Sequence, residues 1–151
     1  MATQKLGFTP EPSYFKYEDA HDGKRYRYAV AHATLTVGTL YGIIVGDGGA
    51  AETVALADDS KPIRVGVATE ATTTDNVARL QTGGVYEGMT TPSLSVTDGH
   101  TLEIAAGAIA DGAAVMPIKD AQQFGVNVGG TTTTATSHDV YLLDREVTPS
   151  T

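Results

Sequence analysis

From Lys24 onward the chain alternates apolar and polar residues with a period of two, and turns rich in glycine interrupt this alternation at short intervals. The clearest example is IRVGVATEA followed by the polar turn TTTDN and by VARLQTGGVYEG, over residues 63–88. A period of two places successive side chains on opposite faces of a β-strand. Short strands separated by turn signals every ten or so residues are typical of all-β sandwiches and barrels. The sequence therefore predicts a compact all-β domain with little helix.

The same pattern predicts individual strands and turns. Strands are expected in KRYRYAVAH, in ATLTVGTLYGIIV with a break at Gly38, in ETVAL, in the two segments above, in two or three pieces of residues 91–120 divided at DGH and ADG, and in DVYLLDREV. The stretch AAGAIADGAAVM is rich in alanine, but Gly107 and Gly112 would each cost a helix about 1 kcal/mol relative to alanine, which favours strand–turn–strand. GVNVGGTTTTATS, residues 125–137, is expected to be a hairpin or a flexible loop.

The first segment, Met1 to Gly23, follows neither a helical nor a strand period. Prolines at positions 10 and 12 favour an extended backbone for the residues before them. Two interpretations remain open for its apolar side chains: they cover one end of the domain's own core, or they form an arm that becomes ordered on another subunit. The predicted division is an extended N-terminal arm at 1–23 and a β domain at 24–151.

Large core residues are scarce, since the 151 residues include three Phe and no Trp. The core must therefore consist mainly of Val, Ile, Leu and Ala, which bury less apolar area per residue at roughly 25 cal/mol per Å². We accordingly expect oligomerisation or docking onto a partner to add stability. There is no cysteine, which excludes disulfides and cysteine-ligated zinc sites.

The net charge of −8 argues against a general nucleic-acid binder and suits a partner with a basic face. KRYRY, residues 24–28, interleaves cations with aromatic residues, as single-strand-binding surfaces do, but in a strand the tyrosines and arginines would occupy opposite faces. The longest apolar run, LYGIIVG, is too short to span a bilayer, and MATQKLGFTPEPSY does not resemble a signal peptide. These features predict a soluble protein that binds neither nucleic acid nor membrane.

No catalytic, cofactor or metal motif is found. The four histidines are scattered without the spacing of a metal site, and GDGG lacks the Lys-Ser/Thr ending of a phosphate loop. Asp58 and Asp59 are expected to form a polar turn. We therefore expect no enzymatic activity and no cofactor. If the protein were an enzyme with an active site at a subunit interface, the residues to test first would be His32, Asp58, Asp59 and His100.

The stretch VGVATEATTTDNVARLQTGGVYEG resembles small capsid decoration (cement, head-stabilising) proteins of tailed bacteriophages. In that family a strand of the type x-V-G-V-A leads through a polar turn into a strand that ends near G-V-Y. ATLTVGTLYGIIV is similar to the family's upstream unit, and TDGHTLEIAAGAIADGAAVMPI is similar to its downstream segment. The resemblance covers residues 31–118, and more loosely the N-terminal segment and the last strand. The Gly/Thr-rich stretch at 125–138 is longer than the family pattern requires, and there is no additional immunoglobulin-like module.

The resemblance implies a β-tulip or β-barrel-like domain that binds the outer surface of an expanded capsid. It implies a homotrimer at local threefold positions that clamps neighbouring major capsid proteins, on a virion made in the host bacterial cytoplasm. It also implies an arm that lies along the shell, whose capsid-binding residues here would be Leu6, Phe8, Pro10, Pro12, Tyr14, Phe15 and Tyr17. An alternative is another virion or tail-associated trimeric β protein, such as an adhesin or a carbohydrate-binding module.

Overall fold

The computed structural model describes residues 17–19, 22–46, 49–56, 62–115 and 121–149, and all of their regular structure is β. The all-β prediction is confirmed, with no helix among these residues and hence no helix long enough to cross a membrane. The strands are β1 (Tyr17–Asp19), β2 (Arg25–Val30), β3 (Leu40–Val45), β4 (Ala51–Val54), β5 (Ile63–Ala68), β6 (Val77–Leu94), β7 (His100–Ala105), β8 (Ala108–Val115), β9 (Gln123–Asn127), β10 (Ala135–Leu143) and β11 (Glu146–Val147).

Five strands close into a small barrel in the order β2-β4-β3-β5-β6 and back to β2. All of its pairings are antiparallel except β2 with β4, which are joined in parallel through Val30 and Glu52. The His32 N–H donates to Thr53 Oγ1 at 3.1 Å and strengthens this closure. A closed barrel has no open sheet edge, so these strands need no partner to satisfy their backbone hydrogen bonds. The prediction of a barrel-like domain is thus confirmed.

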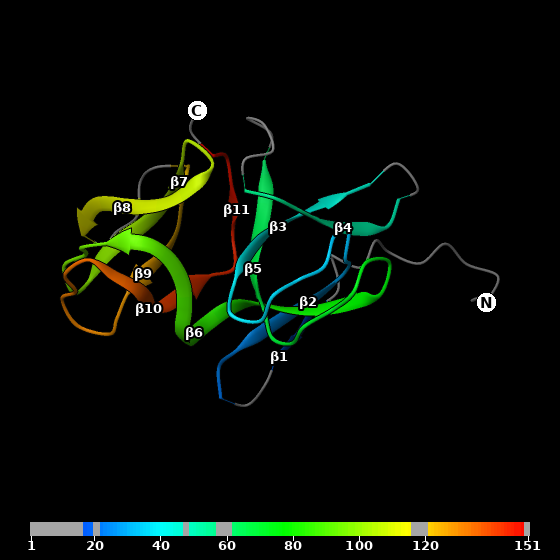
Figure 1. The fold of residues 1–151 in the computed structure, drawn as a ribbon, viewed down its shortest axis with the longest axis horizontal. Helices are drawn as coiled ribbons and strands as arrows, with labels where there is room; N and C mark the ends of the chain where they lie inside the picture. The colour runs from blue at the N-terminus through cyan, green and yellow to red at the C-terminus, as the bar shows by residue number, and fades with distance from the viewer. Residues whose placement is uncertain (1–16, 20–21, 47–48, 57–61, 116–120, 150–151) are drawn as a thin grey trace.

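The rest of the chain forms a second sheet in the order β6-β10-β9-β7-β8. β6 belongs to both halves, because residues 77–83 pair with β2 and residues 83–94 pair with β10. Figure 1 shows β2–β5 on one side of the molecule and β7–β10 on the other, with β6 running between them. β11 pairs with β5 and returns the end of the chain to the barrel.

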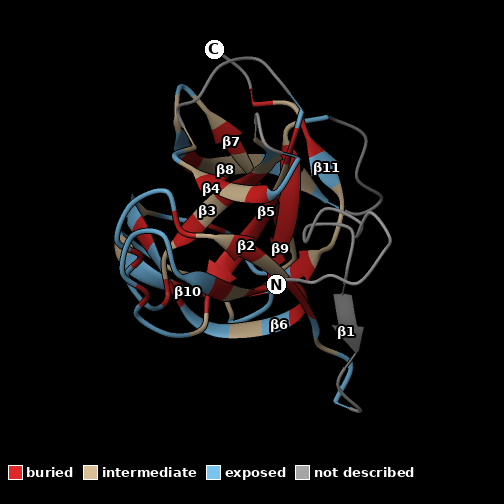
Figure 2. Cartoon of the chain, turned by 90° about the vertical axis from the view of Figure 1, so that its right-hand side faces the viewer, coloured by how far each residue is buried: buried red, intermediate tan, exposed pale blue. Residues whose placement is uncertain are grey.

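Two clusters of buried side chains correspond to these two halves. All five barrel strands contribute to the first cluster, which consists mainly of alanines around Ile43 and Leu80: Ala29, Ala31, Ala51, Ala68 and Ala78. Small residues fit there because a barrel of five strands encloses little space. The second cluster joins the outer side of β3 and β5 to β7, β8, β9 and β10, with Phe124, Leu102 and Leu142 at its centre. Figure 2 shows buried residues along β2, which contributes to the first cluster, along β9, which contributes to the second, and along β5, which contributes to both.

Several predicted boundaries are corrected by the structure. ADG does not divide two strands: the turn lies at Ala106 and Gly107, both with positive φ, while Asp111 and Gly112 lie inside β8. There the Ala113 N–H donates to Asp111 Oδ1 at 2.8 Å, and the pairing with β7 shifts register, so the Asp-Gly pair forms a bulge. β6 continues through Pro92 for 18 residues, longer than predicted. Residues 125–137 form the hairpin of β9 and β10, one of the two predicted alternatives.

Candidate functional site

Asp144 lies at one end of the barrel, in contact with three arginines. Its carboxylate accepts two hydrogen bonds from Arg27, from Nε at 3.1 Å and from Nη2 at 3.4 Å, and one from Arg25 Nη1 at 3.3 Å. Arg64 Nη1 donates to the Asp144 carbonyl oxygen at 2.8 Å and lies 3.6 Å from the carboxylate. Arg25 and Arg27 lie on the same face of β2 as Ala29, which is part of the barrel core. Arg64 likewise lies on the same face of β5 as Ala68. All three arginines are therefore on the strand faces that point into the barrel.

The Asp144 side chain is 8% exposed and the Arg27 side chain 9%, so this pair is largely removed from water. Burial by itself raises the pKa of Asp144, but the hydrogen bonds from Arg27 and Arg25 and the charge of Arg27 outweigh it. The net effect holds the pKa of Asp144 below its ordinary value. The group therefore stays ionised and ties the end of β10 to β2 and β5.

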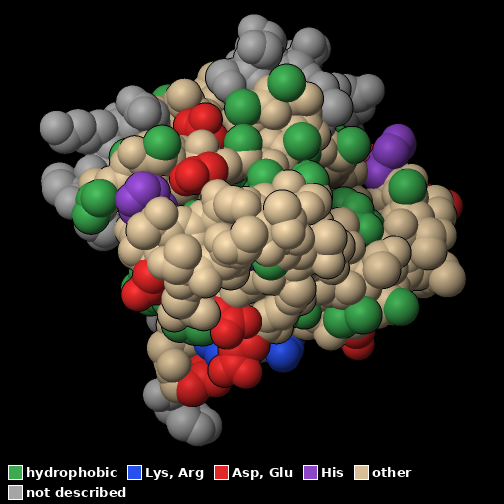
Figure 3. Space-filling view, turned by 60° about the vertical axis from the view of Figure 1, so that its left-hand side comes forward, with side chains coloured by type: hydrophobic (Ala, Val, Ile, Leu, Met, Phe, Trp, Pro, Cys, Tyr) green, Lys and Arg blue, Asp and Glu red, His purple; other side chains and the backbone are tan. Residues whose placement is uncertain are grey.

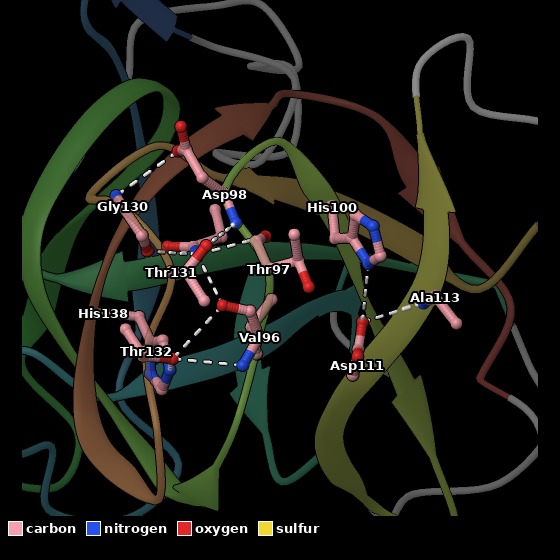
Figure 4. A network of polar contacts seen from close by, with 11 residues as sticks. Val96, Thr97, Asp98, His100, Asp111, Ala113, Gly130, Thr131, Thr132 and His138 are labelled. Carbon is pink, nitrogen blue, oxygen red and sulfur yellow. Dashed lines mark hydrogen bonds and ion pairs between the residues drawn. The ribbon is translucent and has the colours of Figure 1, made fainter.

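The Gly/Thr-rich segment between β9 and β10 is held against residues 93–98 by a ladder of polar contacts (Figure 4). Thr132 N donates to Val96 O at 2.9 Å, and Val96 N donates to Thr132 Oγ1 at 3.1 Å. Next to these contacts, Asp98 N donates to Thr131 Oγ1 at 3.0 Å, and Gly130 N donates to Asp98 Oδ1 at 3.3 Å. Asn127 Nδ2 closes the inner side with a bond to Gly130 O at 2.9 Å. The threonines thus fix the shape of this segment.

His138 is buried behind the same segment, with 2% of its surface exposed. Its Nδ1 lies 2.8 Å from Thr91 Oγ1 and its Nε2 lies 2.8 Å from Thr132 Oγ1. A neutral imidazole has one donor and one acceptor, so one threonine donates to the ring and the other accepts. Burial is the largest influence and lowers the pKa of His138, against the smaller opposing effects of the Leu94 backbone and Asp139.

This environment predicts a stability that depends on pH. A histidine whose pKa is lowered by folding contributes stability that is complete above the pKa of the unfolded chain, 6.5, and is lost as the pH falls below it. The free energy of unfolding should therefore decrease between pH 7.5 and pH 5, and less so in His138→Gln. Urea unfolding at the two pH values measures this. His32→Gln removes a ring that is 74% exposed and should respond to acid as the wild type does. An equal response in all three proteins would contradict the assignment.

The two described residues of the enzyme alternative, His32 and His100, lie in different halves of the molecule. His32 lies on the barrel beside Glu52, with Nδ1 to Oε1 at 3.7 Å. His100 lies on the second sheet, where Figure 4 shows it beside Asp111 and apart from His138, with Nδ1 to Asp111 Oδ1 at 3.8 Å. Asp58 and Asp59 fall outside the described residues. Within the parts of the chain that are described, no group of three or more His, Asp or Glu side chains could hold a metal ion.

The predicted capsid-binding residues Leu6, Phe8, Pro10, Pro12, Tyr14 and Phe15 also fall outside the described residues. Tyr17 begins β1, which pairs antiparallel with β2 from Tyr17↔Arg27 to Asp19↔Arg25. The last part of the predicted arm is therefore an edge strand next to the barrel. The contacts of Arg27 with Asp144 and of His138 with two threonines were not foreseen, and the only signal for the first was the two arginines in KRYRY.

No family model matches the chain, and no curated protein matches it in sequence. Among solved structures, the chain is similar to the N base of head fiber gp8.5 of bacteriophage phi29. The TM-score is 0.51 at 12% sequence identity, and the match covers 81% of this chain and 96% of the phage chain. At this identity the similarity establishes a shared fold, and it includes at least part of the barrel and part of the second sheet, since neither half alone makes up so large a share of the chain.

Proposed function

We propose that the chain is a structural protein of a tailed-bacteriophage virion that binds the outer surface of the capsid and stabilises the expanded shell. The observation that carries this proposal is the shared fold with a phage head fiber base, over nearly the full length of that base. The resemblance of the sequence of residues 31–118 to capsid decoration proteins is in keeping with this proposal. We further propose that the protein is not an enzyme, in keeping with the separation of His32 from His100.

The proposed mechanism is stabilisation by mass action. A protein that binds the assembled, expanded shell and not its loose subunits shifts the equilibrium towards the shell. Contacts with neighbouring major capsid proteins would clamp them together, and a homotrimer at a threefold position would engage several at once. Linking several weak contacts in one oligomer raises the overall affinity without strengthening any single one. The small side chains of the barrel core are consistent with a domain that gains stability from such contacts.

The direct test is binding of the purified protein to expanded capsids of the phage that encodes it, stripped of this protein. We expect saturable binding in a fixed ratio to the major capsid protein. Stripped capsids should release DNA at a lower temperature than complete ones, and adding the protein back should restore the higher temperature. Absence of stoichiometric binding would refute the proposal, and localisation of the protein to tails would favour the adhesin alternative.

The role of the N-terminal segment can be tested by removing Ala2–Lys16. This deletion stops before β1, so the pairing of Tyr17 with Arg27 is kept. We expect an unchanged circular dichroism spectrum and a loss of capsid affinity of tenfold or more, because an extended segment binds through backbone hydrogen bonds and apolar pockets. Pro10 and Pro12 changed together to alanine, in the full chain, give a milder variant of the same segment. Wild-type binding by the deletion would show that these residues do not anchor the protein.

A further inference from the structure

Among the described residues, positively charged side chains are confined to one half of the molecule, whereas negatively charged side chains occur on both halves. The described Lys and Arg residues lie in or beside the strands of the barrel: Lys24, Arg25, Arg27, Arg64, Arg79 and Arg145. Between Arg79 and Arg145 the sequence contains one cation, Lys119, which is outside the described residues. The second sheet instead carries Glu87, Asp98, Glu103, Asp111 and Asp139. Figure 3 shows Asp and Glu at several places on this side, with Lys and Arg visible only near its lower edge.

An apolar patch lies on one face of this acidic half. Tyr141 of β10 and Val85 of β6 are direct cross-strand partners, so their side chains lie next to each other on the same face. They are 46% and 37% exposed. Val128, 44% exposed, lies nearby because its N–H donates to Asp139 O, two residues before Tyr141 on the same strand. We call Val85, Val128 and Tyr141, with the acidic residues beside them, the Tyr141 face.

Two carboxylates border this patch. Glu87, two residues from Val85 on β6, is exposed as Val85 is, and Asp139 lies two residues from Tyr141 on β10, where the register with β6 shifts. Asp139 is fixed in position, since its Oδ1 accepts a hydrogen bond from Gly88 N at 2.9 Å. A central tyrosine with aliphatic neighbours and a charged border is the usual composition of a protein-binding surface.

The charges distinguish between the candidate occupants of this face. A second copy of the chain would bring Glu87 and Asp139 close to their own equivalents, and like charges at an interface cost several kcal/mol. A surface that carries Arg or Lys around an apolar recess would instead match both the patch and its border. The segregation of the described cations to the barrel further weakens the case for contact between two second sheets.

We propose that the Tyr141 face is the surface that docks onto the shell, against a protein surface in which Arg or Lys surrounds an apolar recess. The proposed function supplies only the identity of this partner as a capsid protein. The chemistry of the partner follows from Tyr141, Val85, Glu87 and Asp139 themselves. Docking through this face leaves the barrel and β1 on a different part of the molecule.

The first test measures affinity for expanded capsids as a function of salt. Tyr141→Ala should weaken binding tenfold or more, as truncation of a central interface tyrosine commonly does. Glu87→Lys should weaken binding and reduce its dependence on salt. The matched controls are Val77→Ser, which changes a valine that is 61% exposed on the barrel, and Glu70→Lys, which changes an exposed barrel carboxylate; both should bind as the wild type does. Wild-type affinity of Tyr141→Ala, or equal losses in the controls, would overturn the proposal.

The second test does not depend on capsid binding. A synthetic peptide of alternating Arg and Leu is titrated into isotope-labelled protein, and amide chemical shifts are followed by NMR. Shifts should concentrate at Val85, Glu87, Asp139 and Tyr141, and a Lys/Gly peptide of equal charge should cause smaller ones. Absent shifts, or equal shifts around Glu70 and Asp75 on the barrel, would overturn the proposal. Failure of the wild type to bind capsids would refute the proposed function, while this titration still decides the role of the face.

Sedimentation measurements on the same variants determine whether the Tyr141 face binds a second copy of the chain. A dimer that Tyr141→Ala dissociates would show that this face joins two copies, and would overturn the assignment to a basic partner. An oligomeric state that Tyr141→Ala leaves unchanged agrees with the proposal. Circular dichroism of each variant establishes that it is folded, and because Tyr141 is nearly half exposed we expect only a small loss of stability.

Discussion

Asp144→Asn is expected to lower the free energy of unfolding by about 3 kcal/mol or more, which is the usual cost of removing one partner from a buried ion pair. The variant keeps the size of the side chain and leaves the guanidinium of Arg27, only 9% exposed, next to a neutral amide. Asparagine tolerates the positive φ of 50° at this position, so backbone strain does not contribute to the loss. Urea unfolding followed by circular dichroism measures the change.

Asp22→Asn is the matched control for this variant. Asp22 also pairs with a cation, Lys24, at 3.7 Å, but the two side chains are 51% and 38% exposed. Surface pairs of this kind contribute between zero and about 1 kcal/mol. A loss in Asp144→Asn no larger than that in Asp22→Asn would show that the cluster at the barrel end does not hold the strands together.

The Asp144 cluster also makes stability depend on pH, but here folding favours the charged form of the group, whereas at His138 it favours the neutral form. A carboxylate whose pKa is lowered by folding contributes stability that is present above the pKa of the unfolded chain, 3.8, and is lost as the pH falls below it. His138 loses its contribution in the range below 6.5. The wild type should therefore lose stability in two separate ranges of pH, and Asp144→Asn should lack the lower one.

The strands were predictable because their signals are local. KRYRYAVAH and IRVGVATEA alternate with period two, and each contains one strand at nearly the expected place, β2 and β5. The choice of strand over helix for residues 105–116 was also correct, since two glycines made a helix costly. The prediction of a turn at the Asp-Gly pair in that stretch is wrong. The Asp111 side chain stabilises a bulge within β8, and the turn is formed by Ala106 and Gly107.

The polar clusters were not predictable, because their members are far apart in the sequence. Arg27 and Asp144 are separated by 117 positions and meet only once the barrel has closed. Thr91 and His138 are separated by 47 positions and meet through the register of β6 with β10. The uneven distribution of the cations could have been read from the sequence, since Lys119 is the only Lys or Arg between Arg79 and Arg145. Only the structure shows that the residues of this cation-poor stretch form a separate sheet.

β6 is the element on which the proposed function depends most. It connects the barrel, which β1 borders, to the sheet that presents Val85 and Glu87. A shared strand fixes the relative position of the two proposed contacts, so that both can engage the shell at once. Simultaneous engagement raises affinity only if the geometry allows it, which makes the junction within β6 as important as either contact.

Gly84→Ala should disrupt this junction and lower the free energy of unfolding by about 3 kcal/mol. Gly84 has a φ of +81° at the point where β6 passes from β2 to β10, and left-handed backbone costs an alanine roughly 1–2 kcal/mol. An added Cβ would also lie 2.8 Å from Gly23 O and 3.0 Å from the Lys24 Cα, which are backbone atoms that cannot turn aside. The steric conflict therefore adds to the strain, and relieving it requires β2 and β6 to separate.

Gly99→Ala separates these two causes. Gly99 has nearly the same φ, +80°, but an added Cβ would meet no atom within 4 Å, so only the conformational cost of roughly 1–2 kcal/mol remains. The difference between the two variants measures the steric conflict at the junction. Equal losses would mean that the start of β2 yields without cost, and then the barrel and the second sheet would not be held in one fixed arrangement. A larger loss at Gly84, accompanied by weaker capsid binding in conditions where the variant is still folded, would tie the rigidity of the junction to the proposed two-point attachment.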